Sequence, residues 1–347
     1  MTDFKNFRYS IVIPAYNAEK TIRKAIDSCL NQTIKAEKII VVDDGSTDQT
    51  AAIVRSMAGD QLKLYQTANG GVACARNLGI SVVNTPWVAM LDADDYWETN
   101  KIDVQQRSLH AAGGQIACIF SDFSAFGESG ALISQSYIER YFSAWHDELA
   151  VNAIEKKAAL EILNNDQPIQ IERLGLQKAL FFGNLVLTST SVFNTSLLLK
   201  AGGYARDFTS GGEDYDMYTR LAMLGDFLYV KSSLTCYSRE TPKSLSKNSV
   251  GMATANLRTL ERMLSDSAFA QTIGTNQIAA RRFSAMKWLV SAHFYANELS
   301  LARKLYVKNL LSLLADAEGQ KLGLRLLVPA AIAQSIRNWR HRKATSK

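Results

Sequence analysis

The sequence predicts an α/β fold with a mostly parallel central sheet flanked by helices, followed by an all-helical C-terminal region. In roughly the first third of the chain, short β-branched runs alternate with segments whose apolar residues have helical spacing. From Leu257 onward, the leucines have helical spacing, and strand-like runs no longer alternate with it. Strands that alternate with helices form parallel sheets covered on both faces, so a ligand is expected where the strands end and the loops open.

The elements can be placed in order along the chain. The predicted strands are Tyr9–Ile13, Ile39–Val42, Leu62–Tyr65, Trp87–Leu91 and Ile116–Phe120. Helices are predicted after the first three strands, beginning at the N-cap Asn17, near Ala51 and at Val72. Farther along, Ala144–Asn164 is predicted as a helical insertion and Phe181–Phe193 as strand-like.

The composition is that of a globular protein, which we expect to reside in the cytosol. Of the 347 residues, 47% are hydrophobic and 21% are charged, which argues against disorder. No apolar run approaches the roughly 20 residues that cross a bilayer, and the N-terminus lacks the apolar core of a signal peptide. The cysteines are scattered without metal-ligand spacing, so we expect them to be reduced rather than to form disulfides or a zinc site. They are Cys29, Cys74, Cys118 and Cys236.

The net charge of +6 is unevenly distributed along the chain. Residues 281–347 carry 13 basic and 3 acidic residues, whereas residues 1–280 carry 26 basic and 30 acidic ones. The segment Leu322–Lys347 is basic and amphipathic, contains Trp339 and is interrupted by Pro329, which suits an anionic membrane surface. The alternative is a helix packed on its own domain with a solvated basic face. Nucleic acid is not expected as a partner, because no recognised motif accompanies the basic residues.

Two predicted strands are followed by acidic loops. Asp43–Asp48 has the composition of a turn with an N-cap, and a functional role is the alternative. Asp92–Asp95 places three carboxylates within four residues, which repel one another unless a cation is bound. Oxygen ligands without His or Cys favour Mg²⁺ or Mn²⁺, with phosphate oxygens at the open positions. The absence of GxGxxG after the first strand and of a P-loop disfavours dehydrogenases and P-loop kinases.

Six motifs in order resemble glycosyltransferase family 2, which has the GT-A fold. They are Ile11–Asn17, Val41–Asp48, Asn69–Gly71 with Ala75–Gly79, Leu91–Asp95, Gly202–Tyr204 and Gly212–Asp216. The resemblance covers about residues 9–248. It implies an inverting, metal-dependent enzyme that moves one hexosyl or N-acetylhexosaminyl residue from a nucleotide-diphosphate donor, expected to be a UDP-sugar, to a hydroxyl of a glycan.

The resemblance also suggests the functions of successive parts of the chain and the cellular location of the protein. Residues 1–122 would bind the nucleotide-sugar, residues 123–248 would bind the acceptor and carry the catalytic base, and residues 249–347 would form the basic helical region. The acceptor would be a growing bacterial surface polysaccharide (lipopolysaccharide, capsule or exopolysaccharide), which a lipid could carry. This role fits a protein peripheral to the inner face of the plasma membrane.

The resemblance assigns the donor-binding residues. Pro14 and Tyr16 would line the nucleoside pocket, with Tyr16 packing on the base. Asp44 would accept a hydrogen bond from the base. Arg76 would contact the base or the diphosphate, and a structural ion pair at a helix start is the alternative.

The remaining roles fall to carboxylates. Asp92 would lie near the ribose and the cation, and Asp94 would coordinate Mn²⁺ or Mg²⁺, with Asp95 as a substitute. Asp214 would be the general base, because inverting transfer needs one carboxylate to remove the proton of the acceptor hydroxyl. The alternative for Glu213 and Asp214 is a helix N-terminus, where acidic residues are favoured, and both interpretations can hold together.

One segment departs from the family pattern. Members often have Tyr-Arg-x-His-Pro after the acidic motif, whereas this chain has Ser238-Arg239-Glu240-Thr241-Pro242. Thr241 is a poor metal ligand, but Arg239 and the serines Ser244 and Ser246 could still hold the diphosphate. The departure leaves a non-catalytic subunit that binds a nucleotide-sugar or a glycan as the competing hypothesis. A nucleotidyltransferase is disfavoured, because no Gly-rich basic loop follows the first strand.

Overall fold

A computed structural model describes residues 7–57, 59–127, 130–238, 248–310, 313 and 317–327. These residues belong to two compact units. The first is drawn from Met1–Thr209 and Glu213–Ser244, and the second from Ser210–Gly212 and Leu245–Lys347. The predicted half 1–122 and most of the predicted half 123–248 lie in the first unit, and the separate roles of the two halves stay a prediction.

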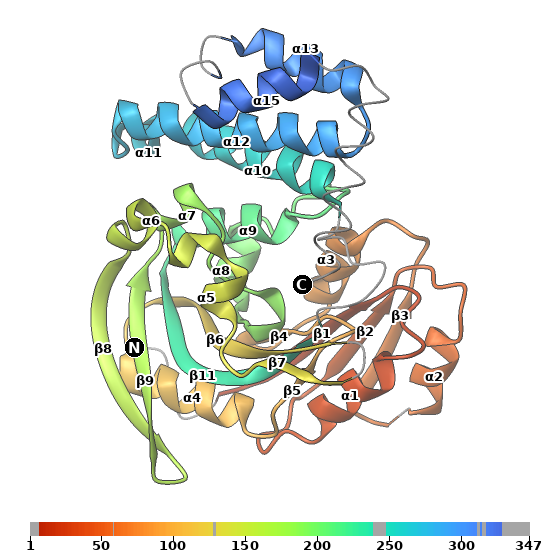
Figure 1. The fold of residues 1–347 in the computed structure, drawn as a ribbon. Coiled ribbons are helices and arrows are strands. Elements are labelled where there is room, and N and C mark those ends of the chain that lie inside the picture. The colour runs from red at the N-terminus through yellow and green to blue at the C-terminus, as the bar shows by residue number, and fades with distance from the viewer. Residues whose placement is uncertain are drawn as a thin grey trace. The chain divides into compact units, whose positions relative to one another are not determined.

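Within the described residues, eleven strands form one sheet in the first unit (Figure 1). They are β1 (Tyr9–Ala15), β2 (Ile39–Asp43), β3 (Leu62–Gln66), β4 (Trp87–Met90), β5 (Tyr96–Trp97), β6 (Ile116–Phe126), β7 (Leu132–Ser134), β8 (Glu155–Asn164), β9 (Gln167–Gly175), β10 (Val192–Asn194) and β11 (Asp226–Ser238). The main order is β3-β2-β1-β4-β10-β6-β11-β9-β8, while β5 pairs with β11 and β7 with β6. The pairs β3–β2, β2–β1, β1–β4 and β6–β11 are parallel, whereas β10, β9 and β8 run antiparallel to their neighbours. The predicted α/β class with mostly parallel central strands is confirmed.

Helices cover both faces of the sheet, because alternate strand residues point to opposite sides. On one face, Ile11 and Ile13 pack in a core with α1 (Ile22–Leu30), α2 (Thr50–Ser56) and α4 (Lys101–Ala112). On the other face, Val12 packs in a second core. Its helices are α3 (Val72–Ser81), α5 (Ile138–Tyr141), α6 (Glu148–Asn152), α7 (Ala179–Phe182), α8 (Thr195–Lys200) and α9 (Glu213–Ala222).

The α3 helix approaches β1 unusually closely at Gly79. A Cβ atom added to Gly79 would lie 2.3 Å from Cγ1 of Val12, which is far inside van der Waals contact. The absence of a side chain therefore sets the distance between this helix and the sheet.

The predicted helical insertion Ala144–Asn164 is wrong. The structure has only the 3-10 turn Ser143–Trp145 and the short α6 there, and β8 then pairs with β9 as an antiparallel hairpin at the sheet edge. In β8, Leu160 and Ile162 pack on the core, whereas Ala159, Glu161 and Leu163 are exposed, which is strand periodicity. Asn165 and Asp166, with φ of 47° and 60°, form the two-residue turn of the hairpin. This turn was not predicted, because the alanines and leucines before it favoured a helix.

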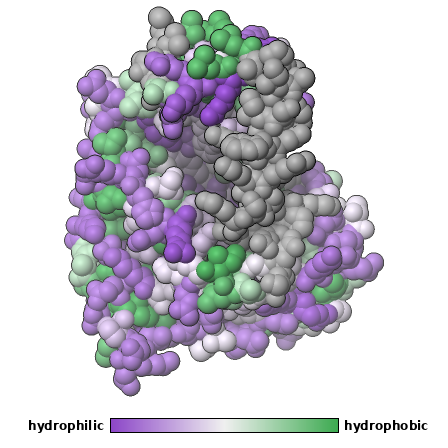
Figure 2. All heavy atoms as spheres, viewed as in Figure 1, coloured by the Kyte–Doolittle hydropathy of each residue, from purple (hydrophilic) through white to green (hydrophobic). Residues whose placement is uncertain are grey.

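The outer surface of this hairpin is mostly polar. Figure 2 shows hydrophilic side chains over the hairpin with hydrophobic ones scattered between them. Lys156 and Lys157 are exposed on β8, and Lys157 donates to Asp226 at 2.8 Å. Charged side chains on an edge strand hinder pairing with another sheet edge.

Two further expectations are corrected. The stretch Phe181–Phe193 is not a strand, because α7 ends at Phe182 and only the last residues join β10. Between them, the hydroxyl-rich residues form a buried 3-10 turn (Thr188–Thr190), called the 188–190 turn below. Asn17 is not an N-cap either: α1 begins after Thr21.

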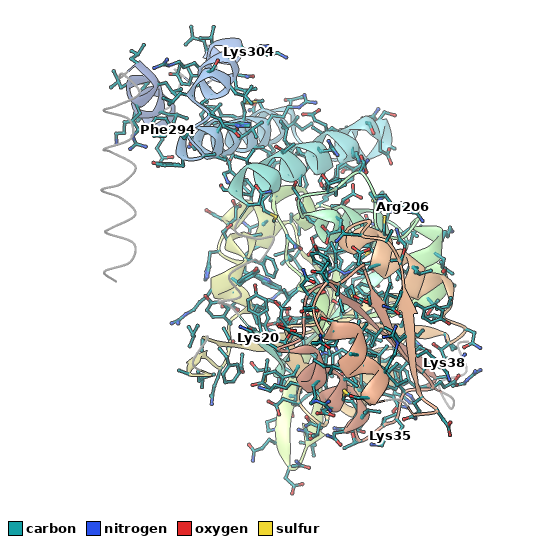
Figure 3. All side chains as sticks on the ribbon, turned by 90° about the vertical axis from the view of Figure 1, so that its right-hand side faces the viewer. Lys20, Lys35, Lys38, Arg206, Phe294 and Lys304 are labelled. Carbon is teal, nitrogen blue, oxygen red and sulfur yellow. The ribbon has the colours of Figure 1, made fainter. Side chains whose placement is uncertain are left out.

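The second unit is helical, as predicted. Its helices are α10 (Ser249–Ser265), α11 (Ser267–Gln271), α12 (Thr275–Tyr295), α13 (Leu299–Lys308) and α15 (Ala317–Leu327). Phe294 lies among these helices in a core with Val290 and Tyr306, whereas Lys304 points outward (Figure 3). Of the helices described, none combines the length and the apolar character that crossing a bilayer requires. The basic segment from residue 328 onward, with Pro329 and Trp339, lies outside the described residues.

Candidate active site

The loops after β1 and β2 are joined by side-chain hydrogen bonds. The Thr47 N–H donates to Oδ1 of Asn17 at 2.8 Å, and the Asn17 N–H donates to Oγ of Ser46 at 2.9 Å. Gly45 has a φ of 75°, and a Cβ there would lie 2.8 Å from the backbone N of Asn69. Much of the Asp43–Asp48 motif therefore forms a turn that joins the two loops. A turn was one of the two interpretations that the sequence allowed.

Asp44 is the exception within that motif. Its carboxylate is buried and accepts backbone N–H donors from Gly70 at 2.9 Å and from Gly71 at 2.8 Å. Each carboxylate oxygen can accept a second hydrogen bond, so the predicted contact with a base stays open. Pro14 is buried at the end of β1, and the next residue but one, Tyr16, has 53% of its surface exposed. An exposed ring beside a buried acceptor is a suitable arrangement for stacking and reading a base.

The acidic loop after β4 alternates in exposure. Asp92 and Asp94 are partly exposed, whereas Asp95 is buried. The Oδ1 atom of Asp95 accepts the Ser238 N–H at 2.9 Å, and Oδ2 has no hydrogen-bond partner. Burial, and then the charges of Asp94 and Asp92, hold the pKa of Asp95 well above its usual range. The neutral form of the Asp95 carboxyl is therefore favoured, while the Asp92 carboxylate is paired with Arg76.

These residues fit a cation that is shared with a phosphate ligand. Across the parts of the chain that are described, no three His, Cys, Asp or Glu side chains converge into a complete metal shell. Asp94 and Asp92 offer only oxygen donors at partly exposed positions, which matches the chemistry of Mg²⁺ or Mn²⁺. A divalent ion with few protein ligands completes its shell with water and phosphate oxygens.

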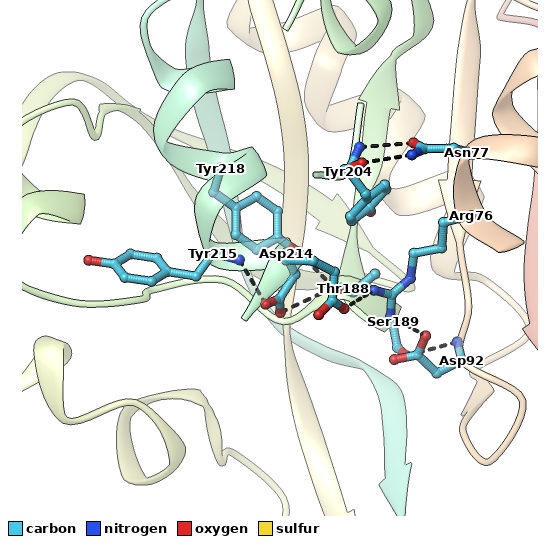
Figure 4. A network of polar contacts seen from close by, with 10 residues as sticks. Arg76, Asn77, Asp92, Thr188, Ser189, Tyr204, Asp214, Tyr215 and Tyr218 are labelled. Carbon is cyan, nitrogen blue, oxygen red and sulfur yellow. Dashed lines mark hydrogen bonds and ion pairs between the residues drawn. The ribbon is translucent and has the colours of Figure 1, made fainter. Parts of the chain in front are cut away.

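Arg76 lies at the centre of the site (Figure 4). Its buried guanidinium donates through Nη2 to Oδ1 of Asp92 at 2.7 Å and through Nη1 to Oε1 of Glu213 at 2.5 Å. The ring centroid of Tyr204 lies 5.0 Å from Cζ of Arg76. Burial alone would lower the pKa of Arg76, but the charges of Asp92 and Glu213 raise it well above its usual value. The structure thus contains the ion pair that was the alternative for Arg76, and a contact with the donor stays a prediction.

Asn77, the next residue of α3, joins a distant motif to the site (Figure 4). Its Oδ1 accepts the Tyr204 N–H at 2.9 Å, and its Nδ2 donates to the Tyr204 carbonyl at 2.7 Å. Gly203 has a φ of 62°, and a Cβ there would lie 2.6 Å from Oδ1 of Asn77. This close approach requires glycine, and it holds the Tyr204 ring against Arg76.

Asp214 lies in the first turn of α9, so the helix-start interpretation is correct and compatible with a catalytic role. Its Oδ1 accepts the Tyr215 N–H at 2.7 Å, and Thr188 Oγ1 donates to its Oδ2 at 3.4 Å. Burial and the charge of Glu213 raise the pKa of Asp214 to about 7, against the opposing effect of Arg76. A carboxylate with a pKa near the working pH is well suited to act as a general base.

The 188–190 turn is a part of the site that the sequence analysis missed. Thr188 contacts Asp214 and also lies 3.1 Å from the hydroxyl of Tyr218, while Ser189 Oγ accepts the Asp92 N–H at 3.1 Å. One turn therefore touches both the acidic loop and the base (Figure 4). The available signal was a run of four hydroxyl residues, Thr188–Ser191, inside an otherwise apolar stretch.

Unsatisfied polar atoms gather at this site. In the described residues, seven buried side-chain N or O atoms lack a hydrogen-bond partner. Four of these atoms belong here: Arg76 Nε, Asp95 Oδ2, Tyr204 Oη and Glu213 Oε2. Because such atoms are costly to leave unpaired, their concentration points to a polar ligand. The predicted diphosphate contact Arg239, together with Thr241 and the serines that follow it, lies outside the described residues.

The fold and the site define a GT-A type domain with an acidic loop at one end of its parallel strands and a carboxylate at the start of α9. Residues 10–143 match the family model "Glycosyl transferase family 2". Over these residues the chain therefore matches family 2 glycosyltransferases, as its motifs predicted.

A curated relative and two solved structures illustrate the likeness. The chondroitin synthase of Pasteurella multocida strain Pm70 is 26% identical over 232 residues, which cover 66% of this chain and 20% of the synthase. The chain spans about a fifth of the length of the first curated relatives it matches.

S. aureus TarS 1–349 in complex with UDP-GlcNAc has a TM-score of 0.52 at 18% identity, covering 87% of this chain and 89% of that chain. GalNAc-T7 with UDP, GalNAc and Mn²⁺ has a TM-score of 0.51 at 12% identity, and the match covers 74% of this chain and 48% of that chain. At these identities the likeness concerns the fold.

Proposed function

We propose that the protein is an inverting glycosyltransferase that moves one sugar from a UDP-sugar to a hydroxyl of a glycan. The observation that carries this proposal is the placement of Asp214, whose pKa is raised to about 7, beside the Arg76 network that leads to Asp92. The TarS complex with UDP-GlcNAc and the GalNAc-T7 complex with UDP support the class of donor. The likeness to a chondroitin synthase supports a role in polysaccharide assembly.

The residues divide the reaction between them. Tyr16, Pro14 and Asp44 hold the nucleoside, and Arg239 contacts the diphosphate. Asp214 accepts the proton of the acceptor hydroxyl as that oxygen attacks the anomeric carbon, and the bond to the diphosphate breaks on the opposite face. A Mn²⁺ or Mg²⁺ ion held by Asp94 and Asp92 would neutralise charge on the leaving diphosphate. The acceptor hydroxyl belongs to a glycan, which a lipid at an anionic membrane surface could carry.

Asp94→Ala is expected to weaken the binding of UDP in the presence of Mn²⁺ by about tenfold or more, because the ion loses its main protein ligand. Binding of UDP without Mn²⁺ should change little. Isothermal calorimetry with and without Mn²⁺ measures both quantities. Asp60→Ala, which removes an exposed carboxylate outside the site, is the control. Equal affinity of Asp94→Ala and wild type in Mn²⁺ would show that Asp94 does not hold the ion.

The rate of transfer is expected to rise with pH through about pH 7. The base works only when Asp214 is deprotonated, so kcat/KM should fall tenfold per pH unit below the pKa of Asp214. Glu213→Gln should move this profile to lower pH, because the charge that helps to raise the pKa is gone. Initial rates across pH for both proteins measure the shift. A profile that does not move would exclude Glu213 as a cause.

A non-catalytic subunit makes the opposite prediction. Such a protein would bind a UDP-sugar but would neither transfer the sugar nor hydrolyse the donor slowly in the absence of acceptor. Release of UDP from UDP-GlcNAc by the purified protein, compared with Asp214→Asn, separates the two functions.

A further inference from the structure

Three side chains donate hydrogen bonds to the carbonyl groups of the 188–190 turn, and one of them is Thr235, whose Oγ1 donates to the Ser189 carbonyl at 3.3 Å. The indole Nε1–H of Trp97 donates to the Ser189 carbonyl at 2.7 Å, and Nε2 of Gln105 donates to the Thr190 carbonyl at 2.9 Å. Two hydroxyls of the same turn face the site, where Thr188 contacts Asp214 and Ser189 contacts the Asp92 N–H, whereas the Thr190 hydroxyl donates to the Leu187 carbonyl at 2.7 Å. The turn is thus fixed through its carbonyls and acts through its side chains.

A buried lysine completes this arrangement. Lys101, at the start of α4, is fully buried, donates to Oε1 of Gln105 at 2.7 Å and lies 4.3 Å from the ring centroid of Trp97. Within the part of the chain that the structure describes, Lys101 has no carboxylate partner. Burial lowers the pKa of Lys101 to about 7, with a small opposing effect of the buried thiols Cys29 and Cys118. An amine in this place is costly, and an apolar side chain of similar length would fill the same space.

The contacts run from one face of the sheet to the other. Trp97 packs in the core shared with α1 and α4, whereas Tyr218 on α9 packs in the core on the opposite face. The 188–190 turn connects them, because it bonds to Trp97 and Gln105 on one side and to Tyr218 and Asp214 on the other. A polar chain of this kind fixes the direction of its members more narrowly than apolar packing does.

We propose that Lys101, Gln105 and Trp97 are positioning residues, which act through the 188–190 turn to align the catalytic carboxylate Asp214 with the loop that carries Asp92. Lys101 orients the Gln105 amide, and the Gln105 amide and the Trp97 indole orient consecutive carbonyls of the turn. This inference rests on the proposed function, since its kinetic consequence is a slower transfer step. Misplacement of reacting groups by about 1 Å can cost two orders of magnitude in rate.

Two substitutions test the chain of contacts, and one serves as the matched control. Lys101→Met removes the amine and keeps the length, while Trp97→Phe keeps an aromatic ring and removes the N–H donor. Tyr9→Phe also removes one buried donor to a backbone carbonyl, the 2.6 Å bond to Ile34, but that bond has no contact with the turn. For each protein, kcat, the KM for UDP-GlcNAc and the melting temperature are measured.

We expect kcat to fall roughly 10- to 100-fold in Lys101→Met and in Trp97→Phe, with the KM for UDP-GlcNAc within about twofold of wild type. Tyr9→Phe should lower the melting temperature as much as Trp97→Phe does and should keep kcat within about twofold. Wild-type kcat in a folded Trp97→Phe would overturn the proposal. So would an equal loss of kcat in Tyr9→Phe, because the effect would then follow stability alone.

Hydrogen exchange separates this proposal from the proposed function. Amides in Leu187–Ser191 and Leu91–Asp95 should exchange faster in Trp97→Phe and Lys101→Met than in Tyr9→Phe, whether or not the protein turns over a UDP-sugar. If the wild-type protein shows no transfer and no hydrolysis, the proposed function fails, and faster exchange still supports the positioning role. Unchanged exchange in both segments would refute the positioning role even in an active enzyme.

Discussion

Asp214→Asn is expected to lower kcat by roughly 10²–10⁴-fold, the usual contribution of a general base. The amide keeps the shape of the carboxylate and can still accept the Tyr215 N–H, so the donor site should stay intact. The KM for UDP-GlcNAc and the affinity for UDP should therefore remain within a few-fold of wild type. Steady-state transfer assays and calorimetry measure these quantities. Wild-type kcat in this variant would exclude Asp214 as the base.

The stability of the same variant separates loss of catalysis from loss of folding. The pKa of Asp214 is raised in the folded state, so this group favours folding most at low pH and less as the pH rises through about 7. Above that pH the folded protein bears the cost of a buried carboxylate charge, which the neutral amide does not have. At pH 8 the melting temperature of Asp214→Asn should therefore equal or exceed that of wild type. Asp103→Asn, a carboxylate-to-amide change on the surface of α4, is the control. A strongly lowered melting temperature at pH 8 would contradict the assignment of the pKa.

Arg76→Met is expected to destabilise the protein by about 3–5 kcal/mol, because the substitution leaves Glu213 buried and unpaired. The lower end of that range is expected, since 31% of the Asp92 side chain is exposed and can be hydrated, whereas only 5% of the Glu213 side chain is. Transfer should be lost as well, because Arg76 holds Asp92 and Glu213 on either side of the site. Urea unfolding measures the loss of stability.

Two further proteins make the Arg76 experiment decisive. Arg76→Met with Glu213→Gln should regain part of the stability, because the buried charge is removed together with its partner. Arg8→Met breaks an exposed ion pair with Glu37 and should change stability far less. A single Arg76→Met variant as stable as Arg8→Met would show that the buried pairs contribute little.

Local patterns predicted the N-terminal strands, the helices after them and the acidic loops, because each depends on neighbouring residues. The residues that connect these motifs could not be predicted in the same way. Arg76 and Glu213 are 137 positions apart, and Trp97 and Ser189 are 92 apart, so their contacts exist only once the sheet has formed. The β8–β9 hairpin was missed for a related reason: pairing along the sheet overrides the helix propensity of its alanines and leucines.

The 188–190 turn is the clearest example of a part of the site that the sequence could not predict. Four hydroxyl residues in an apolar stretch can belong to a strand, a turn or a helix end, and the sequence does not distinguish them. Trp97, Gln105 and Thr235, all distant from this segment in the sequence, donate hydrogen bonds to its carbonyls. Residues that receive their conformation from distant partners are therefore the part of the site that motifs leave out.

The close approach of α3 to β1 at Gly79 has a consequence for the electrostatics of the site. Arg76 lies one helical turn before Gly79 and reaches Asp92 and Glu213 from the same helix. A methyl group at position 79 would lie 2.3 Å from Val12 and would push the helix outward, drawing the guanidinium away from both carboxylates. The two ion pairs of Arg76, which lie next to the catalytic base, thus depend on the absence of a single methyl group at position 79. That position packs against the sheet and lies outside the site.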